Sequence, residues 1–415
     1  MKKQSWISTA TTIASFAAAS VVTMLTVGPA AGQTTGFGSA ELDRFIAQKM
    51  EQMRSPGLAV LAVKGDTIVW SRGYGLADLP GGQPVTPDLP FLLASVSKTV
   101  TATAMMQLVE QGLCALDDDV NDYLPFSVRN PAFPNSPITI ESLLGHDSSI
   151  HNRQEILPIT FGADSPIALG DLVADYLTPG GALYDPVLNF LPYEPGTTYE
   201  YANIGYAVIG YLVERISGLP FDEYCNIRIF DALGMTRTSW RLADYAAWGI
   251  DLATPYYYEP TEQRYFVYPQ TGIAHYPAGR LKSSVNDLAR FLIAHMNDGL
   301  SGGVQLLQPA TVALMHTLRP TSFDRWAGGH GDGLGFSIDE HWASDNRLSI
   351  GHTGLLVGAA TVMKFRPDTR VGAIVFADSA PGILTPSGTR LIDGWENAVY
   401  VDVSARLMDE AEALE

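Results

Sequence analysis

The sequence contains only two cysteines, Cys114 and Cys225, in 415 residues. This number excludes a disulfide-rich scaffold and a cysteine-rich zinc site. A disulfide needs two Cα atoms within about 7 Å of each other, a distance that sequence spacing does not give. Pairing and buried free thiols therefore both remain open for these two residues.

Positive charge is also scarce, because 26 Lys and Arg stand against 44 Asp and Glu, for a net charge of −18. Binding to nucleic acid or to an anionic membrane needs clustered cations, and the sequence has no such cluster. The eight histidines form no paired ligand motif of the H-E-x-x-H type. We therefore expect no nucleic acid, metal or cofactor, and a small molecule or peptide as the substrate. The oligomeric state is not indicated.

Long hydrophobic runs are absent except at the N-terminus. Two lysines precede an uncharged run from Trp6 to Val27, and small residues follow as far as Gly32. This order predicts a signal peptide over residues 1–32 that is cleaved before Gln33. The run is long enough to span a bilayer, so a retained anchor is the alternative. Cleavage would leave no membrane span and a periplasmic or secreted protein.

Strand patterns lie near both ends of the chain, and helical patterns broken by long loops lie between them. This order predicts an α+β fold, in which an antiparallel sheet from the N- and C-terminal segments is flanked by helices and carries a mostly helical insertion. We expect one domain over 33–415, with 33–95 and 330–415 as its α/β part and 96–329 as its mainly helical part. The residues 158–195 are expected to be mostly loop, and 328–333 a loop before a strand. The expected terminal elements are helices at Glu41–Arg54 and Ile392–Leu414, a hairpin of Leu58–Val63 and Thr67–Tyr74, and strands at Gly333–Ile338, Leu348–Gly351, Ala359–Arg366 and Arg370–Ala377.

The first chemical motif is Ser95-Val96-Ser97-Lys98, which precedes an apolar helical stretch. A spacing of i, i+3 places Ser95 and Lys98 on one face of a helix. A serine hydroxyl needs a base to become a nucleophile, and a lysine in an apolar pocket has a lowered pKa that suits this task. The alternative is that Ser95 only caps the helix.

The second motif is Tyr201-Ala202-Asn203, which lies between a Pro-Gly turn and an apolar helical stretch. A tyrosine held near a lysine ammonium ionises more easily and can relay a proton. The amide of Asn203 can donate to a substrate carbonyl. The alternative for Tyr201 is a packed ring with a hydrogen-bonded hydroxyl.

The third motif is His352-Thr353-Gly354, at the end of a strand-like stretch. The glycine allows substrate to approach the backbone closely. The amide of the next residue, Leu355, can pair with the amide of Ser95 as an oxyanion hole. Alone, His352 would more often be structural than catalytic.

In chain order, these three motifs resemble the signature elements of the penicillin-recognising serine hydrolases, which include class C β-lactamases, D,D-peptidases and related esterases. The resemblance extends from about Glu41 to Ala377. It implies a serine hydrolase that forms an acyl-enzyme on Ser95 and cleaves an amide or ester, with a D-amino-acid peptide as one substrate class. It further implies that Lys98 and Tyr201 share the proton transfers and that Asn203 holds the substrate amide or the lysine.

Departures from the family pattern refine this prediction. His352 stands where typical class C β-lactamases have lysine, which favours a peptidase or esterase over a β-lactamase. Arg280 is placed near the site by the resemblance and can bind the substrate carboxylate in place of that lysine, with a surface ion pair as the alternative. His146 is expected to be structural. A β-lactamase, and an idle binding or scaffold homologue, remain the alternative functions.

Overall fold

The computed structural model describes residues 38–322, 330–342, 347–380 and 399–414. The predicted signal peptide and its cleavage site lie outside these residues, as do Gly328, Gly329 and the beginning of the C-terminal helix expected from Ile392. Within the described ranges, no helix has the length and apolar character needed to cross a membrane.

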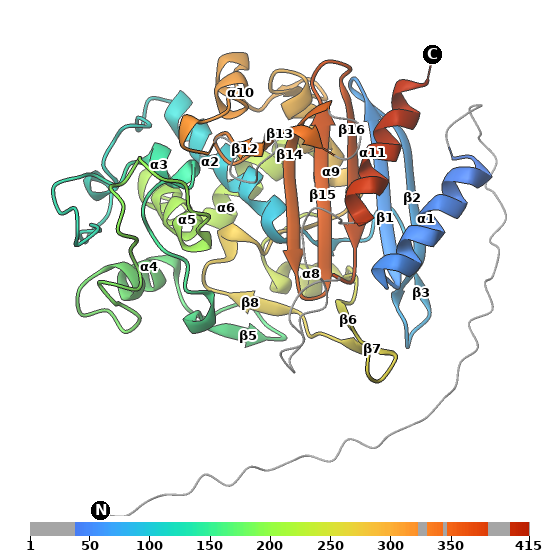
Figure 1. Cartoon of the computed structure of the whole chain (residues 1–415), viewed down its shortest axis with the longest axis horizontal. Coiled ribbons are helices and arrows are strands. Elements are labelled where there is room, and N and C mark those ends of the chain that lie inside the picture. Colours follow the sequence, from blue (N-terminus) through green and yellow to red (C-terminus); the bar gives the residue numbers. More distant parts are fainter. Residues whose placement is uncertain (1–37, 323–329, 343–346, 381–398, 415) are drawn as a thin grey trace, which may run out of the picture. The chain divides into compact units, whose positions relative to one another are not determined.

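An eight-stranded antiparallel sheet forms the centre of the described fold (Figure 1). Segments from both ends of the chain build it, since β1 lies between β2 and β16 and Val60 pairs with Val375. The predicted α+β class is therefore confirmed. The strands, in their order across the sheet, are β12 (His330–Asp332), β13 (Ser337–Trp342), β14 (Arg347–Leu356), β15 (Ala359–Arg366), β16 (Val371–Ala377), β1 (Gly57–Lys64), β2 (Thr67–Asp78) and β3 (Gln83–Pro84).

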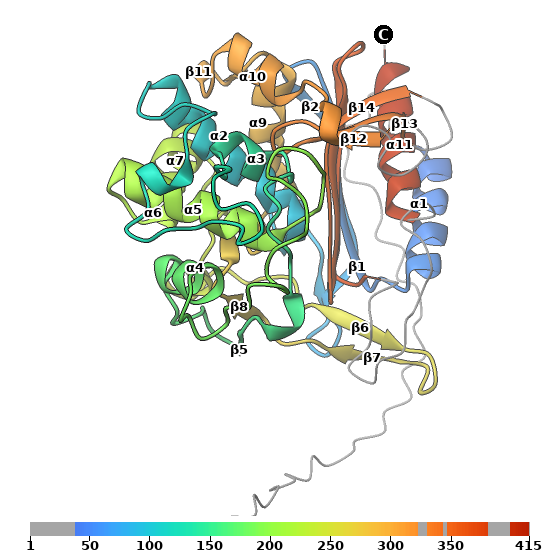
Figure 2. The same cartoon turned by 60° about the vertical axis from the view of Figure 1, so that its left-hand side comes forward.

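Both faces of the sheet are covered (Figures 1 and 2). On one face lie α1 (Ala40–Met53) and α11 (Val399–Glu412), whose Leu42 and Leu407 are fully buried with Val60 of β1. On the other face, α9 (Val285–Met296) packs on β1 and β16. Seven of the eight residues of β1 are buried, as expected for a central strand covered on both sides.

The helical region follows β3 and continues to η6. Its α-helices are α2 (Ser97–Glu110), α3 (Ile140–Leu144), α4 (Leu169–Leu177), α5 (Asn203–Ser217), α6 (Phe221–Cys225), α7 (Asp231–Leu233), α8 (Leu242–Trp248) and α10 (Pro309–Met315), together with α9. Short 3-10 turns are η1 (Ala94–Val96), η2 (Val120–Asp122), η3 (Gln154–Ile156), η5 (Tyr276–Ala278) and η6 (Pro320–Ser322), and η4 (Asn226–Phe230) is a π-helical turn. Four two-stranded pairs complete it: β4 (Phe91–Leu92) with β9 (Lys282–Ser283), β5 (Ile159–Phe161) with β8 (Thr271–Ile273), β6 (Tyr256–Glu259) with β7 (Arg264–Val267), and β10 (Leu300–Ser301) with β11 (Val304–Gln305).

One expectation about local structure was incomplete, and two were wrong. The residues 158–195 contain β5 and α4, because pairing with β8 and burial of an apolar helix face order this segment. The strand expected at Gly333–Ile338 begins only at Ser337, since Gly333 to Phe336 form a tight turn with a backbone hydrogen bond. The last residues of the loop expected at 328–333 instead form β12, which pairs with β13.

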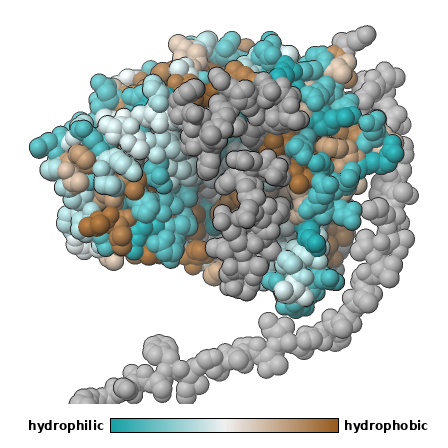
Figure 3. Space-filling view, in the orientation of Figure 1, coloured by the Kyte–Doolittle hydropathy of each residue, from teal (hydrophilic) through white to brown (hydrophobic). Residues whose placement is uncertain are grey.

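Both cysteines are buried free thiols, so the open question about pairing is settled. Burial raises the pKa of both thiols, and that of Cys114 reaches about 12. The two residues are therefore inert as nucleophiles at neutral pH. The face of the molecule seen in Figure 3 is mostly hydrophilic, with hydrophobic residues scattered over it, as is usual for protein surfaces.

Candidate active site

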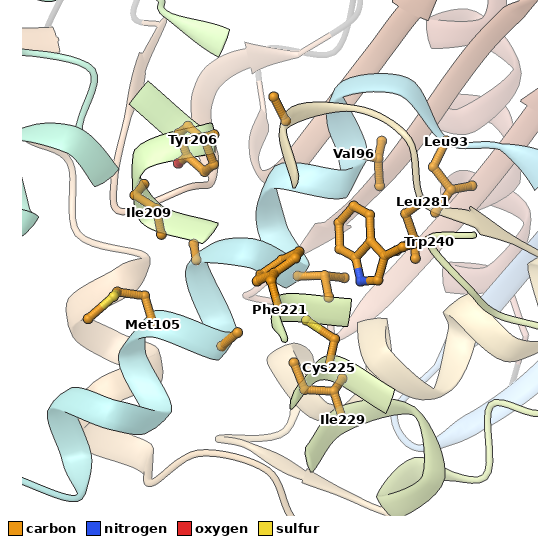
Figure 4. Packing of buried hydrophobic residues seen from close by; sticks show 14 of the residues in the cluster. Leu93, Val96, Met105, Tyr206, Ile209, Phe221, Cys225, Ile229, Trp240 and Leu281 are labelled. Carbon is orange, nitrogen blue, oxygen red and sulfur yellow. The ribbon is translucent and has the colours of Figure 1, made fainter. Parts of the chain in front are cut away.

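Ser95 lies in the turn η1 that leads from β4 into α2. The residue before it, Ala94, has a φ of 48°, in the left-handed region that residues other than glycine seldom adopt. Leu93, just before this turn, and Val96, its last residue, are fully buried and pack in the core with Leu281 and Trp240 (Figure 4). The packing holds the strained turn in place and fixes where the Ser95 side chain begins.

Lys98 follows one turn later, in α2, and is completely buried. Its Nζ lies 3.1 Å from Ser95 Oγ and 2.6 Å from the carbonyl oxygen of Ala278. Burial lowers the pKa of Lys98 well below its ordinary value. A neutral amine at this distance can accept the proton of the serine hydroxyl. The spacing of the first motif thus gives the expected pair.

Tyr201 precedes α5, and its ring lies against the amine of Lys98, with Nζ 4.8 Å from the ring centroid. Its hydroxyl is buried and lacks a hydrogen bond of normal geometry to any described residue. Burial raises the pKa of Tyr201. The Ser95 hydroxyl lowers that pKa, but by less than burial raises it. The expectation that this tyrosine ionises easily was therefore wrong, because desolvation outweighs its neighbours. Tyr201 is a protonated hydroxyl at neutral pH.

His146 lies behind Tyr201 and supports it. The two ring centroids are 4.3 Å apart, and Nδ1 of His146 accepts a hydrogen bond of 3.2 Å from the backbone amide of Ala202. The next residue, Asp147, is fully buried and forms an ion pair of 2.8 Å with Arg319. These contacts agree with a structural position for His146.

Asn203 is the first residue of α5. Its backbone amide donates a hydrogen bond of 3.1 Å to Oδ1 of Asn152. Its side-chain amide donates to Gln154 Oε1 at 3.3 Å and makes no hydrogen bond with Lys98. Gln154 in turn lies 3.4 Å from Nε2 of His275. Asn203 therefore belongs to a polar row with Gln154 and His275, and of its two expected roles the contact with the lysine is absent.

The third motif lies on β14, which packs against the Ser95 turn. The ring of His352 is 6.4 Å from that of Tyr201, so the second and third motifs are neighbours in space. At Gly354, a Cβ atom would lie 2.3 Å from the carbonyl oxygen of Leu93 and 3.0 Å from Cβ of Ala94. Because Gly354 has no side chain, β14 can pack directly against Leu93 and Ala94, the residues just before Ser95. Thr353 and Leu355 therefore also lie close to the Ser95 turn.

Replacing Gly354 with alanine should therefore force β14 away from the Ser95 turn. We expect an unfolding free energy lower by about 1 to 3 kcal/mol, as for other overpacked sites, measured by chemical denaturation. Gly205→Ala in α5 is the matched control, because its Cβ would meet no described atom closer than 3.6 Å and alanine favours helices. Equal stability of wild type and Gly354→Ala would contradict the close approach.

Arg280 lies between η5 and β9, on a segment bonded closely to the Ser95 turn. It is 7% exposed, so the alternative of a surface ion pair was wrong. Burial lowers the pKa of Arg280 to about 10, which leaves the guanidinium charged at neutral pH. Burial, and to a smaller extent the nearby Arg280 and Lys98, lower the pKa of His275 to about 3, so that imidazole is neutral.

The sequence motifs gave no indication of three groups at this site: Gln154, His275 and the carbonyl oxygen of Ala278. The carbonyl belongs to the backbone and leaves no residue signature. Gln154 begins η3 and His275 precedes η5, far apart in the chain, and the pairing of β5 with β8 brings these two segments together. The turn sequence Pro277-Ala278-Gly279 is the one local signal that the chain bends sharply here.

Together, these groups surround a serine hydroxyl with an amine of lowered pKa, a protonated phenol and a closely packed strand. The described residues include no cluster of three His, Cys, Asp or Glu that could hold a metal ion. The arrangement can deprotonate a serine, supply a proton from a second group, and place a carbonyl along β14. The fold and site define a β-lactamase-type serine hydrolase.

Comparison with known proteins gives the family. The profile of the Beta-lactamase family matches residues 42–390, and the chain belongs to that family. It is similar to "Penicillin-binding protein 4" of Amycolatopsis lactamdurans, with 28% identity over 84% of this chain and 87% of that protein. It is also similar to "Protein flp" of Staphylococcus aureus, with 23% identity over 83% of this chain, and it spans only 64% of that relative. The structure of a D-amino acid amidase from Ochrobactrum anthropi superposes with a TM-score of 0.68 and 19% identity, covering 90% of this chain and 99% of the other.

Proposed function

We propose that this chain is an exported hydrolase that cleaves an amide or ester through an acyl-enzyme on Ser95. Oγ of Ser95 attacks the substrate carbonyl carbon while Nζ of Lys98 takes the hydroxyl proton. The bond to the leaving nitrogen or oxygen then breaks, and that atom takes a proton relayed from Lys98 through Tyr201. Water attacks the acyl-enzyme by the reverse proton path and releases the acid. The amides of Ser95 and Leu355 bind the oxyanion, and His352 and Thr353 line the strand side.

The observation that carries this proposal is the pair formed by Ser95 and Lys98. The lysine is buried, its pKa is lowered, and its Nζ lies 3.1 Å from the hydroxyl oxygen. A charged lysine would only donate to that oxygen, whereas a neutral one can remove its proton. The raised pKa of Tyr201 supports a role as proton donor rather than as the initial base.

The substrate class is proposed to be a D-amino-acid amide, peptide or ester. The structural neighbour described as a D-amino acid amidase supports this choice. His352 in the position of a family lysine favours it over a dedicated β-lactamase. Export follows from the predicted signal peptide, in keeping with a substrate outside the cytoplasm.

The test is intact-mass measurement of the purified chain after incubation with a fluorophosphonate, followed by a panel of esters, D-amino-acid amides and β-lactams. We expect a single fluorophosphonate adduct that peptide mapping places on Ser95, and turnover of an ester or amide. A β-lactam should give a slowly hydrolysed adduct, whereas rapid β-lactam turnover would indicate a β-lactamase. Failure of every reagent to acylate Ser95 would refute the proposal and favour an idle binding protein.

A further inference from the structure

Arg319 and Asp147 form an ion pair in the interior of the protein. Asp147 is fully buried, and Oδ2 of its carboxylate accepts hydrogen bonds from Arg319 at 2.8 Å and from Oγ1 of Thr321 at 2.7 Å. The guanidinium also binds the carboxylate of Glu141 in α3. Removal of one partner of a buried pair leaves the other charge uncompensated. The position of Asp147 is therefore coupled closely to that of Arg319.

The backbone beside Asp147 is shaped around this arginine. Gly145 ends α3, and a Cβ atom there would lie 2.2 Å from Nε of Arg319. The next residue, His146, has a φ of 60°, in the left-handed region that residues other than glycine seldom adopt. Surrounding contacts must hold such a backbone in place, and the ion pair of Asp147 is one of these contacts.

The segment held by Arg319 is bonded to the backbone on both sides of Tyr201. The carbonyl oxygen of His146 accepts a hydrogen bond of 2.7 Å from the amide of Glu200, and Nδ1 of the same histidine accepts one of 3.2 Å from the amide of Ala202. The Tyr201 hydroxyl adds no hydrogen bond of normal geometry to any described residue. The place of this tyrosine is therefore set largely by its backbone and by the ring of His146.

Arg319 is itself anchored to the main sheet. Its backbone amide donates to the carbonyl oxygen of Asp332 in β12 at 3.0 Å, and Oγ of Ser322 donates to the same oxygen at 2.8 Å. β12 pairs with β13, and β13 pairs with β14, the strand that carries His352. The ion pair thus joins the segment that places Tyr201 to the sheet that carries the third motif.

We propose that Arg319 and Asp147 position Tyr201 for proton transfer to the leaving group. This inference rests on the proposed function, because it assigns a positioning role in the reaction at Ser95. In that reaction the Tyr201 hydroxyl gives its proton to the leaving nitrogen or oxygen as the bond to the carbonyl carbon breaks, and it regains a proton from Lys98. A misplacement of about 1 Å is enough to slow such a step by about 100-fold.

The test uses two esters that differ in their need for that proton. Ethyl acetate releases an alcohol, whose oxygen must be protonated as it leaves, whereas p-nitrophenyl acetate releases a stable phenolate. Both give the same acetyl-enzyme, and kcat/KM compares its formation from free enzyme and substrate. We expect Arg319→Met to lower kcat/KM by about 10- to 100-fold for ethyl acetate and by less than about 3-fold for p-nitrophenyl acetate. Arg319→Lys should keep part of the ethyl acetate rate, because it retains the charge but not the planar geometry.

Two further variants separate positioning from a loss of stability. Arg319→Met leaves the carboxylate of Asp147 buried and unpaired, whereas the double variant Asp147→Asn/Arg319→Met removes both charges. The double variant should melt close to wild type and show the same difference between the two esters. Arg366→Met is the matched control, because Arg366 is also buried and its ion pairs with Asp409 and Glu412 involve α11. It should melt at a lower temperature and keep the wild-type ratio of the two kcat/KM values.

Hydrogen exchange measures the anchoring without any substrate. The amides of Glu200 and Ala202 should exchange faster in the double variant than in wild type, and at the wild-type rate in Arg366→Met. This measurement shows whether the ion pair holds the segment even if Ser95 is never acylated and the proposed function fails. An equal loss of kcat/KM for both esters in the double variant would overturn the inference, as would unchanged exchange at these two amides.

Discussion

Replacing Ser95 with alanine should lower kcat by about 10³-fold or more on every ester or amide that the wild type hydrolyses. Neither neighbouring group can replace the lost nucleophile. Lys98 is completely buried and cannot reach the substrate carbonyl, and Tyr201 keeps its proton at neutral pH. The variant should fold normally, since Ser95 is held by its backbone rather than by its hydroxyl. The measurements are steady-state kinetics and the loss of the fluorophosphonate adduct by intact mass.

Ser97→Ala is the matched control for this prediction. Ser97 lies two residues away in the same motif, and its hydroxyl accepts the amide of Leu281 at 3.1 Å. Its loss leaves a buried amide unpaired and should cost about 1 to 3 kcal/mol of stability. The adduct on Ser95 should nevertheless still form. Adduct formation that survives Ser95→Ala but disappears in Ser97→Ala would mean that the other serine reacts.

Replacing Lys98 with methionine should lower kcat by about 10² to 10⁴-fold, the usual contribution of a general base. Methionine keeps the apolar volume of the side chain and removes the amine. In wild type, the rate should rise with pH as Lys98 loses its proton. The lowered pKa moves this rise well below the ordinary range of lysine. Lys98→Arg should stay inactive at every pH up to 10, since arginine does not deprotonate in this range.

The pH profile of kcat/KM distinguishes this role from a structural one. A residue that only fills space would change the amplitude of the profile and leave its shape intact. The methionine variant should instead lose the rising limb and show a residual rate that is flat with pH. A rising limb that persists unchanged in Lys98→Met would assign the base to another group.

The sequence predicted the main sheet because its strands carry local signals. β1 is a continuous apolar run from Leu58 to Val63, β16 is apolar throughout, and the Gly65 turn joins β1 to β2. The short pairs such as β5 with β8 were missed because two or three residues carry no periodicity and their pairing depends on distant partners. The strand expected from Gly333 failed for a related reason. Gly335 turns the chain with a φ of 79° against α2, which only the tertiary contact reveals.

The candidate site was predicted where sequence spacing fixes geometry. The i, i+3 relation brought Ser95 and Lys98 to hydrogen-bonding distance. The prediction that Tyr201 ionises easily was wrong because the sequence pattern indicates the neighbouring lysine but not the burial of the hydroxyl, which raises its pKa. Burial also lowers the pKa of Lys98, the cation that was expected to favour ionisation of Tyr201. The partners of Asn203 are Asn152 and Gln154, which come from a distant segment of the chain, and their approach has no counterpart in residue spacing.

The strand order of the sheet also bears on how the chain folds. β1 is synthesised long before its partner β16, because Val60 pairs with Val375. Such pairing gives a high contact order, and chains of this kind fold slowly because a long loop must close first. The Ser95 turn likewise cannot pack against β14 until residues 347–356 have been synthesised. Catalytic competence should therefore appear only after β14 and β16 have been synthesised and have joined the sheet.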